Sequence, residues 1–112
     1  MELTELANCL EKLSNPTRLA VFKLLVKAGP EGLPVGELQS HLGVPPSTLS
    51  HHILFLVTVG LIQQERQGRV LRCKPNFKRM NAIIESLKEE CCAGVTPRRA
   101  AVASKRRKAA VG

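Results

Sequence analysis

Two adjacent cysteines near the C-terminal end, Cys91 and Cys92, are the residues of this chain best suited to chemistry. Cysteine thiolates bind soft, thiophilic ions in preference to hard ones. The other two cysteines, Cys9 and Cys73, stand alone, and no C-x-x-C pair typical of a zinc site occurs. Two consecutive cysteines near a helix end are seldom both core residues, because one of them must face outward. We therefore expect Cys91 and Cys92 to be ligands, and Cys73 to be a small buried hydrophobe.

A second group of side chains, between residues 39 and 72, suits contact with nucleic acid. The segment from Val44 to Lys74 predicts an amphipathic helix followed by a basic hairpin. Such a pair can place one element in a DNA major groove and the other against the neighbouring backbone. The candidate base-reading residues are Ser47, Thr48, Ser50, His51 and His52. The candidate phosphate or minor-groove contacts are Gln39 and Ser40 on the preceding helix and Arg66, Arg69 and Arg72 on the hairpin.

The elements that begin and end the chain are predicted to be helices. Apolar residues at steps of three and four predict a first helix over residues 2–13. Asn15 is expected to cap a second helix from Pro16 to Ala28, which is apolar over much of its circumference. Asn76 is expected to cap a last helix from Phe77 to about Cys92.

The elements between them are predicted to form a helix-turn-helix and a wing. Residues 34–42 predict a short third helix that ends at Gly43. Ser47 is the expected cap of a fourth helix, whose predicted core face consists of Leu49, Ile53 and Leu56. Residues 61–66 and 70–74 predict two strands of a hairpin around Gln67-Gly68-Arg69. The predicted fold is therefore mainly α (α+β), with five helices and a two-stranded wing.

Net charge divides the chain into a body, residues 1–94, and a tail, residues 95–112. The whole chain carries a net charge of +8, and the tail holds six basic residues and no acidic one. We expect the tail to be disordered. It is either a solvated end or a nonspecific phosphate-binding arm, and the sequence leaves both open. No apolar run approaches the length of a membrane span and no signal peptide is evident, so we expect a cytoplasmic protein.

Several motifs in this order resemble the ArsR/SmtB family of metal-responsive bacterial repressors. They are LSNPTRLAVFKLLV from residue 13, the Ser50-x-His52 pair, Gly60-Leu61-Ile62 and the Gln67-Gly68-Arg69 turn. The resemblance covers about residues 3–94. It implies a homodimer formed through the first and last helices, which binds double-stranded operator DNA with an inverted repeat and releases it when an inducer binds.

The same resemblance points to the inducer. The family's Cys-Val-Cys site on the third helix is absent, and residues 76–92 contain no His or Asp for the site on the last helix. The remaining pair, Cys91-Cys92, looks like that of the arsenic-responsive subgroup, although the third cysteine that many of those proteins carry further on is missing. The implied inducer is a trivalent arsenical, namely arsenite, antimonite or methylarsenite. Inorganic arsenite prefers three sulfurs, so Cys9 of the partner subunit is a further candidate ligand.

Three other functions stay open. A repressor of the same fold can sense cadmium, lead, mercury, zinc or thiol oxidation, although a disulfide between neighbouring cysteines is strained. An architectural DNA-binding protein would need no effector at all. A dithiol enzyme has little support, because neither a phosphate-binding loop nor a C-x-x-C motif occurs, and we expect no enzymatic activity.

The predicted recognition helix departs from the family in its charge. Residues 47–60 contain no Lys or Arg, where family members usually place them on the exposed side. Instead, Leu54, Phe55 and Val57 add apolar surface, which is either buried by the wing and the neighbouring helices, as we expect, or a contact patch. Positive charge for DNA would then come from the wing and the tail.

Overall fold

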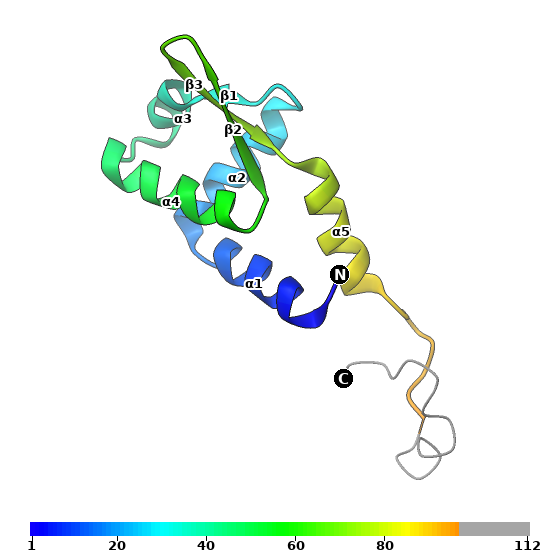
Figure 1. The fold of residues 1–112 in the computed structure, drawn as a ribbon. Coiled ribbons are helices and arrows are strands. Elements are labelled where there is room, and N and C mark those ends of the chain that lie inside the picture. Colours follow the sequence, from blue (N-terminus) through cyan, green and yellow to red (C-terminus); the bar gives the residue numbers. More distant parts are fainter. Residues whose placement is uncertain (97–112) are drawn as a thin grey trace.

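The computed structural model describes residues 1–96, so most of the basic tail, including its predicted disorder and the phosphate-binding role left open for it, lies outside the described residues. Five helices and three strands follow one another in the order α, α, β, α, α, β, β, α (Figure 1). Their bounds are α1 Leu3–Leu13, α2 Pro16–Ala28, β1 Leu33–Pro34, α3 Val35–Leu42, α4 Pro46–Thr58, β2 Ile62–Gln67, β3 Val70–Pro75 and α5 Phe77–Lys88. Within residues 1–96, no helix is both long enough and apolar enough to span a membrane.

Asparagine caps start two of the helices as predicted. The Asn15 side chain accepts a hydrogen bond from the Arg18 backbone N–H at 3.0 Å at the start of α2. The Asn76 side chain accepts the equivalent bond from Arg79 at 3.1 Å at the start of α5. Each bond satisfies one of the backbone donors that a helix leaves unpaired at its N-terminus.

The start of α4 differs from the prediction. Ser47 is not its cap, because the helix begins one residue earlier, at Pro46, and Pro45 occupies the cap position without a side-chain bond. The fixed φ of a proline suits the first position of a helix, where its missing N–H costs nothing. Two consecutive prolines therefore start this helix in place of a serine hydroxyl, and the Ser47 side chain is exposed.

The predicted hairpin is present, and a third strand joins it. Strands β2 and β3 pair antiparallel from Ile62↔Pro75 to Gln67↔Val70. The two-residue β1 pairs with the other edge of β3, giving the order β1-β3-β2. The sequence did not predict β1, because two residues show no alternation. Gly32 precedes it with φ +63°, and any Cβ there would collide with the Cys73 carbonyl, so only glycine permits this approach.

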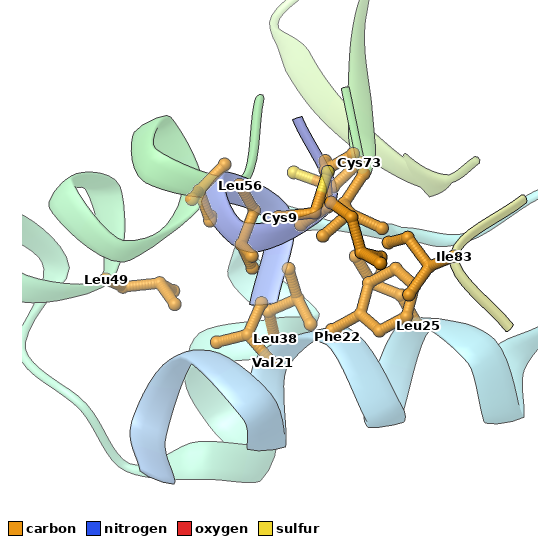
Figure 2. Close-up of a cluster of buried hydrophobic side chains, with 13 residues drawn as sticks. Cys9, Val21, Phe22, Leu25, Leu38, Leu49, Leu56, Cys73 and Ile83 are labelled. Carbon is orange, nitrogen blue, oxygen red and sulfur yellow. The ribbon is translucent and has the colours of Figure 1, made fainter. Parts of the chain in front are cut away.

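One hydrophobic core joins the helices to the sheet (Figure 2). The predicted core face of α4 is buried, and it consists of Leu49, Ile53 and Leu56. Cys73 on β3 is 0% exposed, which confirms that it is a buried hydrophobe. Figure 2 shows Cys9 of α1 in the same cluster of buried side chains.

The last helix is shorter than predicted. It ends at Lys88 instead of continuing to about Cys92, and residues 89–92 form turns. Glu89 and Glu90 follow one another at this point, where the negative end of the helix dipole disfavours acidic side chains. Glu90 takes a left-handed backbone conformation, φ 59°, which breaks the helical path.

Candidate DNA interface and thiol pair

Helices α3 and α4 form the predicted helix-turn-helix. Gly43 ends α3 in the left-handed conformation, φ 65°, and lets the chain turn into α4. On α3, Gln39 is half-buried and Ser40 is exposed. The exposed candidates on α4 are Ser47, Thr48, Ser50 and His51. The structure thus brings these four polar side chains together on the outer surface near the start of α4, where a recognition helix contacts base edges.

The outer stripe of α4 also contains an apolar residue. Ser47, His51, Leu54 and Thr58 follow at steps of four, three and four residues and therefore line one face of the helix. Leu54 is 60% exposed and Phe55 is 40% exposed, so the expectation that both are buried is wrong; Val57 is half-buried. Only one face of a helix can face the core, and Ile53 and Leu56 form that face of α4. Leu54 and Phe55, which lie between them in the sequence, therefore point outward.

Two cations from other helices cover the Phe55 ring. The Arg18 guanidinium of α2 lies 4.6 Å from the ring centroid, and the Lys12 ammonium of α1 lies 5.2 Å from it. The His51 ring is tilted against Phe55 with centroids 6.1 Å apart. Lys12 is paired with the Glu11 carboxylate at 3.2 Å, so it is chiefly Arg18 that places positive charge beside this helix, which contains no Lys or Arg. Sequence reasoning missed this, because the three helices meet only in the folded chain.

His52 differs from its neighbour His51 in its surroundings. It is half-buried, and burial lowers the pKa of its imidazole, with the charges of Arg18 and His51 acting in the same direction. Its Nδ1 and the Nε of Arg18 are buried, and neither has a hydrogen-bond partner within residues 1–96. A base-reading role for His52 stays a prediction, and its burial favours His51 as the reader.

The three wing arginines fall into two groups. Arg66 and Arg69 are exposed near the tip of the hairpin. Arg72 is half-buried: its Nε donates to the Gln67 side chain at 3.1 Å, and its Nη1 donates to the Glu31 carbonyl at 3.0 Å. Arg72 thus connects the wing to the turn before β1. Of the three predicted DNA contacts, Arg66 and Arg69 are therefore the better placed.

An ion pair between β3 and β2 neutralises one acidic side chain of the wing. The Lys74 ammonium lies 3.2 Å from the Glu65 carboxylate. Hydrogen bonds from Lys74 and from the Gln67 amide lower the pKa of Glu65. A carboxylate paired in this way repels DNA phosphates less than a free one would.

The end of α4 is joined to α5 by side-chain bonds to two backbone carbonyls. Arg79 donates from Nε to the Val59 carbonyl at 2.9 Å and from Nη1 to the Glu5 carboxylate of α1 at 2.8 Å. Asn76 donates from Nδ2 to the Gly60 carbonyl at 2.9 Å. The hydrogen bond from Arg79 lowers the pKa of Glu5, and the carboxylate raises that of Arg79. Sequence patterns do not indicate these contacts, which link residues 16 to 74 positions apart.

The thiols of Cys91 and Cys92 lie together and face solvent. Their sulfurs are 3.5 Å apart, and both residues are exposed. On a regular helix adjacent side chains point about 100° apart. Here Cys92 has a left-handed backbone, φ 62°, beyond the end of α5. The turn thereby brings two sulfurs to the same side of the chain.

The other two thiols are inaccessible within the domain. Cys9 is 0% exposed, and its Sγ contacts the Val59 carbonyl at 3.9 Å. Burial raises the pKa of the Cys73 thiol, which accepts a weak bond from Gln64. Across residues 1–96, no group of three or more His, Cys, Asp and Glu side chains is arranged to hold a metal ion. Within residues 1–96 of one protomer, the predicted ligands Cys91 and Cys92 are therefore the two exposed thiols.

Comparison with known proteins gives three informative matches and one family model. A model described as a helix-turn-helix domain matches residues 13–65. The HTH-type transcriptional regulator YgaV of Escherichia coli (strain K12) is 31% identical over 86 residues, which are 77% of this chain and 85% of that protein. The crystal structure of an ArsR family transcriptional regulator is 30% identical, with a TM-score of 0.66, and the match covers 77% of this chain and 91% of that one.

A more distant match supports the fold alone. The homodimeric winged helix-turn-helix DNA-binding domain of a possible ArsR-family regulator from Mycobacterium bovis, solved by NMR, is 23% identical. Its TM-score is 0.62, and the match covers 79% of this chain and 82% of that one. This chain and that domain thus share the winged helix-turn-helix fold.

Proposed function

Because the chain belongs to the ArsR family of transcriptional regulators, which are DNA-binding proteins and not enzymes, we propose that it is a repressor induced by a trivalent arsenical. In this proposal α4 and the wing bind the operator. The arsenical binds Cys91 and Cys92 at the end of α5, and the protein then leaves the DNA.

The observation that carries the arsenical assignment is the 3.5 Å separation of the two exposed sulfurs. Two bonds of about 2.3 Å, the length of a zinc–thiolate bond, that meet at about 90–110° place their sulfurs about 3.3–3.8 Å apart. The thiols of Cys91 and Cys92 therefore already have the spacing of two ligands on one soft centre, and binding requires little rearrangement.

The number of thiols favours a methylated arsenical. A monomethylated trivalent arsenic has one valence on carbon and two on hydroxyl oxygens. Each Cys thiol forms an As–S bond while one As–O bond breaks, the thiol proton leaves with the hydroxyl as water, and the oxidation state does not change. Inorganic arsenite or antimonite would need a third sulfur, for which Cys9 of the partner subunit is the candidate. The burial of Cys9 means that α1 would have to move first.

Two of the alternative sensing chemistries, zinc binding and thiol oxidation, fit the pair less well. Zinc sites in proteins are almost always four-coordinate, and the protomer supplies two thiols. A disulfide needs the sulfurs at about 2.05 Å and Cα atoms usually at least about 4.4 Å apart, whereas neighbouring Cα atoms are separated by only about 3.8 Å. Oxidation would therefore strain the turn, while an arsenical bridges the sulfurs at their present spacing.

We propose that the repressor is a homodimer through α1 and α5. These two helices expose large apolar side chains, namely Leu3, Leu10, Ile84 and Leu87, at 38–61%. Burial of such side chains against a second copy removes them from water. A two-fold dimer presents two copies of α4, which matches an operator with an inverted repeat. The bonds from Arg79 and Asn76 to the end of α4 join the dimer helix to the recognition helix.

The test is release of DNA by defined inducers. A fluorescent duplex is first selected from a random-sequence pool by the reduced, full-length protein, and its anisotropy is followed during titration. Methylarsenite, arsenite, antimonite, cadmium and peroxide are compared, with a non-thiol reductant present except for peroxide. We expect methylarsenite to release the DNA at about one equivalent per chain, and Cys91→Ser or Cys92→Ser to abolish release.

Two controls make the outcome specific. Cys73→Ala removes a thiol but leaves the pair intact, so release should not change. Cys9→Ala should leave the methylarsenite response intact and weaken only the arsenite response if Cys9 is a third ligand. Release by cadmium alone, or an unchanged response in the two serine variants, would overturn the arsenical assignment.

A further inference from the structure

Leu54 is a large apolar side chain on the face of α4 that the helix-turn-helix presents to DNA. It is 60% exposed and follows Ser47 and His51 along the outer stripe. The distance from Ser47 to Leu54 along the helix axis is about 10 Å, at 1.5 Å per residue. Both fit within one major groove, which is about 12 Å wide. Leu54 therefore lies on the same helix face as Ser47 and His51, two of the predicted base-reading residues.

The chemistry of α4 points to base edges as its contacts. The helix contains no Lys or Arg, so its exposed side chains have no cation for phosphates. The cations nearby, Arg18 and Lys12, lie to one side, over Phe55. A leucine offers neither donor nor acceptor, so it gains from a major groove only where the DNA itself is apolar. The apolar group on the major-groove edge of a base pair is the C5 methyl of thymine.

We propose that Leu54 reads a thymine methyl group in each operator half-site and is a specificity-determining residue of this repressor. The proposal rests on the proposed binding of α4 to the operator. The neighbours of Leu54 on the stripe, Ser47 and His51, are polar and so do not extend an apolar protein interface. The larger set of exposed apolar side chains lies on α1 and α5, where the proposed dimer contact would bury it.

Replacing thymidine with deoxyuridine tests the methyl group alone, because the two nucleosides differ only in the C5 methyl. In the selected duplex, each thymine of one half-site is replaced in turn by deoxyuridine, and the dissociation constant of the full-length protein is measured by anisotropy. We expect one position at which the replacement weakens binding about fourfold, which corresponds to one buried methyl group. The Leu54→Ala variant should bind thymine and uracil at that position equally.

Two further variants separate reading from folding. Leu54→Met keeps an apolar contact and should keep discrimination against uracil. Leu19→Ala is the matched control, since it removes another partly exposed leucine, on α2, and should leave the fourfold effect unchanged. If no position loses its thymine preference in Leu54→Ala, or if Leu19→Ala loses it equally, the proposal is wrong. Failure to enrich any duplex would instead overturn operator binding, and with it this reading role.

Discussion

The two asparagine caps form a matched pair from which the contribution of the α4–α5 junction can be measured. Asn15 and Asn76 each accept a backbone N–H bond at a helix start, at 3.0 and 3.1 Å. Asn76 in addition donates to the Gly60 carbonyl at 2.9 Å, which ties α5 to the residues after α4. The difference between the two alanine variants therefore isolates that additional bond.

The expected magnitudes follow from these contacts. Loss of an N-cap costs about 1 kcal/mol, so Asn15→Ala should lower the free energy of unfolding by about that amount. An intramolecular hydrogen bond contributes about 1 kcal/mol net, so Asn76→Ala should cost about 2 kcal/mol. Asn76→Asp keeps the capping oxygen but cannot donate to Gly60, and should lose about 1 kcal/mol or slightly more, because its carboxylate then faces that carbonyl.

Urea denaturation followed by far-UV circular dichroism measures these differences. All variants are compared at one protomer concentration, because the stability of a dimer depends on concentration. Equal m-values would show that the change lies in stability and not in the extent of unfolding. Equal losses for Asn15→Ala and Asn76→Ala would refute the reasoning, since the Gly60 bond would then contribute nothing.

Three further predictions concern other parts of the molecule. In the folded state the pKa of His52 is lower than the ordinary 6.5, so the unfolded state binds more protons below that pH. The free energy of unfolding should therefore fall as the pH drops below about 6.5. His52→Gln should flatten this pH dependence, which urea titrations from pH 8 to 5 would measure. Arg69→Ala should reduce the slope of the logarithm of the DNA-binding constant against the logarithm of the salt concentration by about 1, without changing stability. Arg72→Ala should instead lower the melting temperature, because the bonds of Arg72 hold the wing to the turn before β1. An unchanged melting temperature of Arg72→Ala would contradict this. Gly32→Ala should destabilise the fold by more than about 2 kcal/mol, since it combines a left-handed backbone with a collision against the Cys73 carbonyl, and a melting temperature within 2 °C of the parent, about 0.5 kcal/mol, would refute the close approach.

Local features of this fold were predictable from sequence because neighbouring residues cause them. Asn15 and Asn76 cap the helices that follow them, and glycine lies at the hairpin turn where φ is +66°. Apolar residues spaced three and four positions apart correctly predicted the core face of α4. Each of these signals acts within one or two helical turns, so no tertiary contact was needed to read them.

Features that depend on distant residues were missed or misjudged. Strand β1 exists because β3, some forty residues later, pairs with it. The Arg79 bonds to Val59 and Glu5 span 20 and 74 positions. Leu54 was expected to be buried by the wing and the neighbouring helices, but it is 60% exposed. For the site, the residue types at Cys91-Cys92 were evident, whereas the 3.5 Å spacing depends on a turn where a helix was expected.

The burial of Cys9 makes it a natural reporter of motion at the centre of the domain. Its thiol is fully enclosed, touches the Val59 carbonyl and lies beside the Arg79 guanidinium that docks α5. A thiol reagent can reach it only when α1 separates from these neighbours. The exposed Cys91 and Cys92 react at once, so a slower third thiol would time the opening of the α1–α5 contact. The rate at which a reagent modifies Cys9 would therefore measure the movement of α1 away from α5 that ligand binding at Cys91 and Cys92 is proposed to drive.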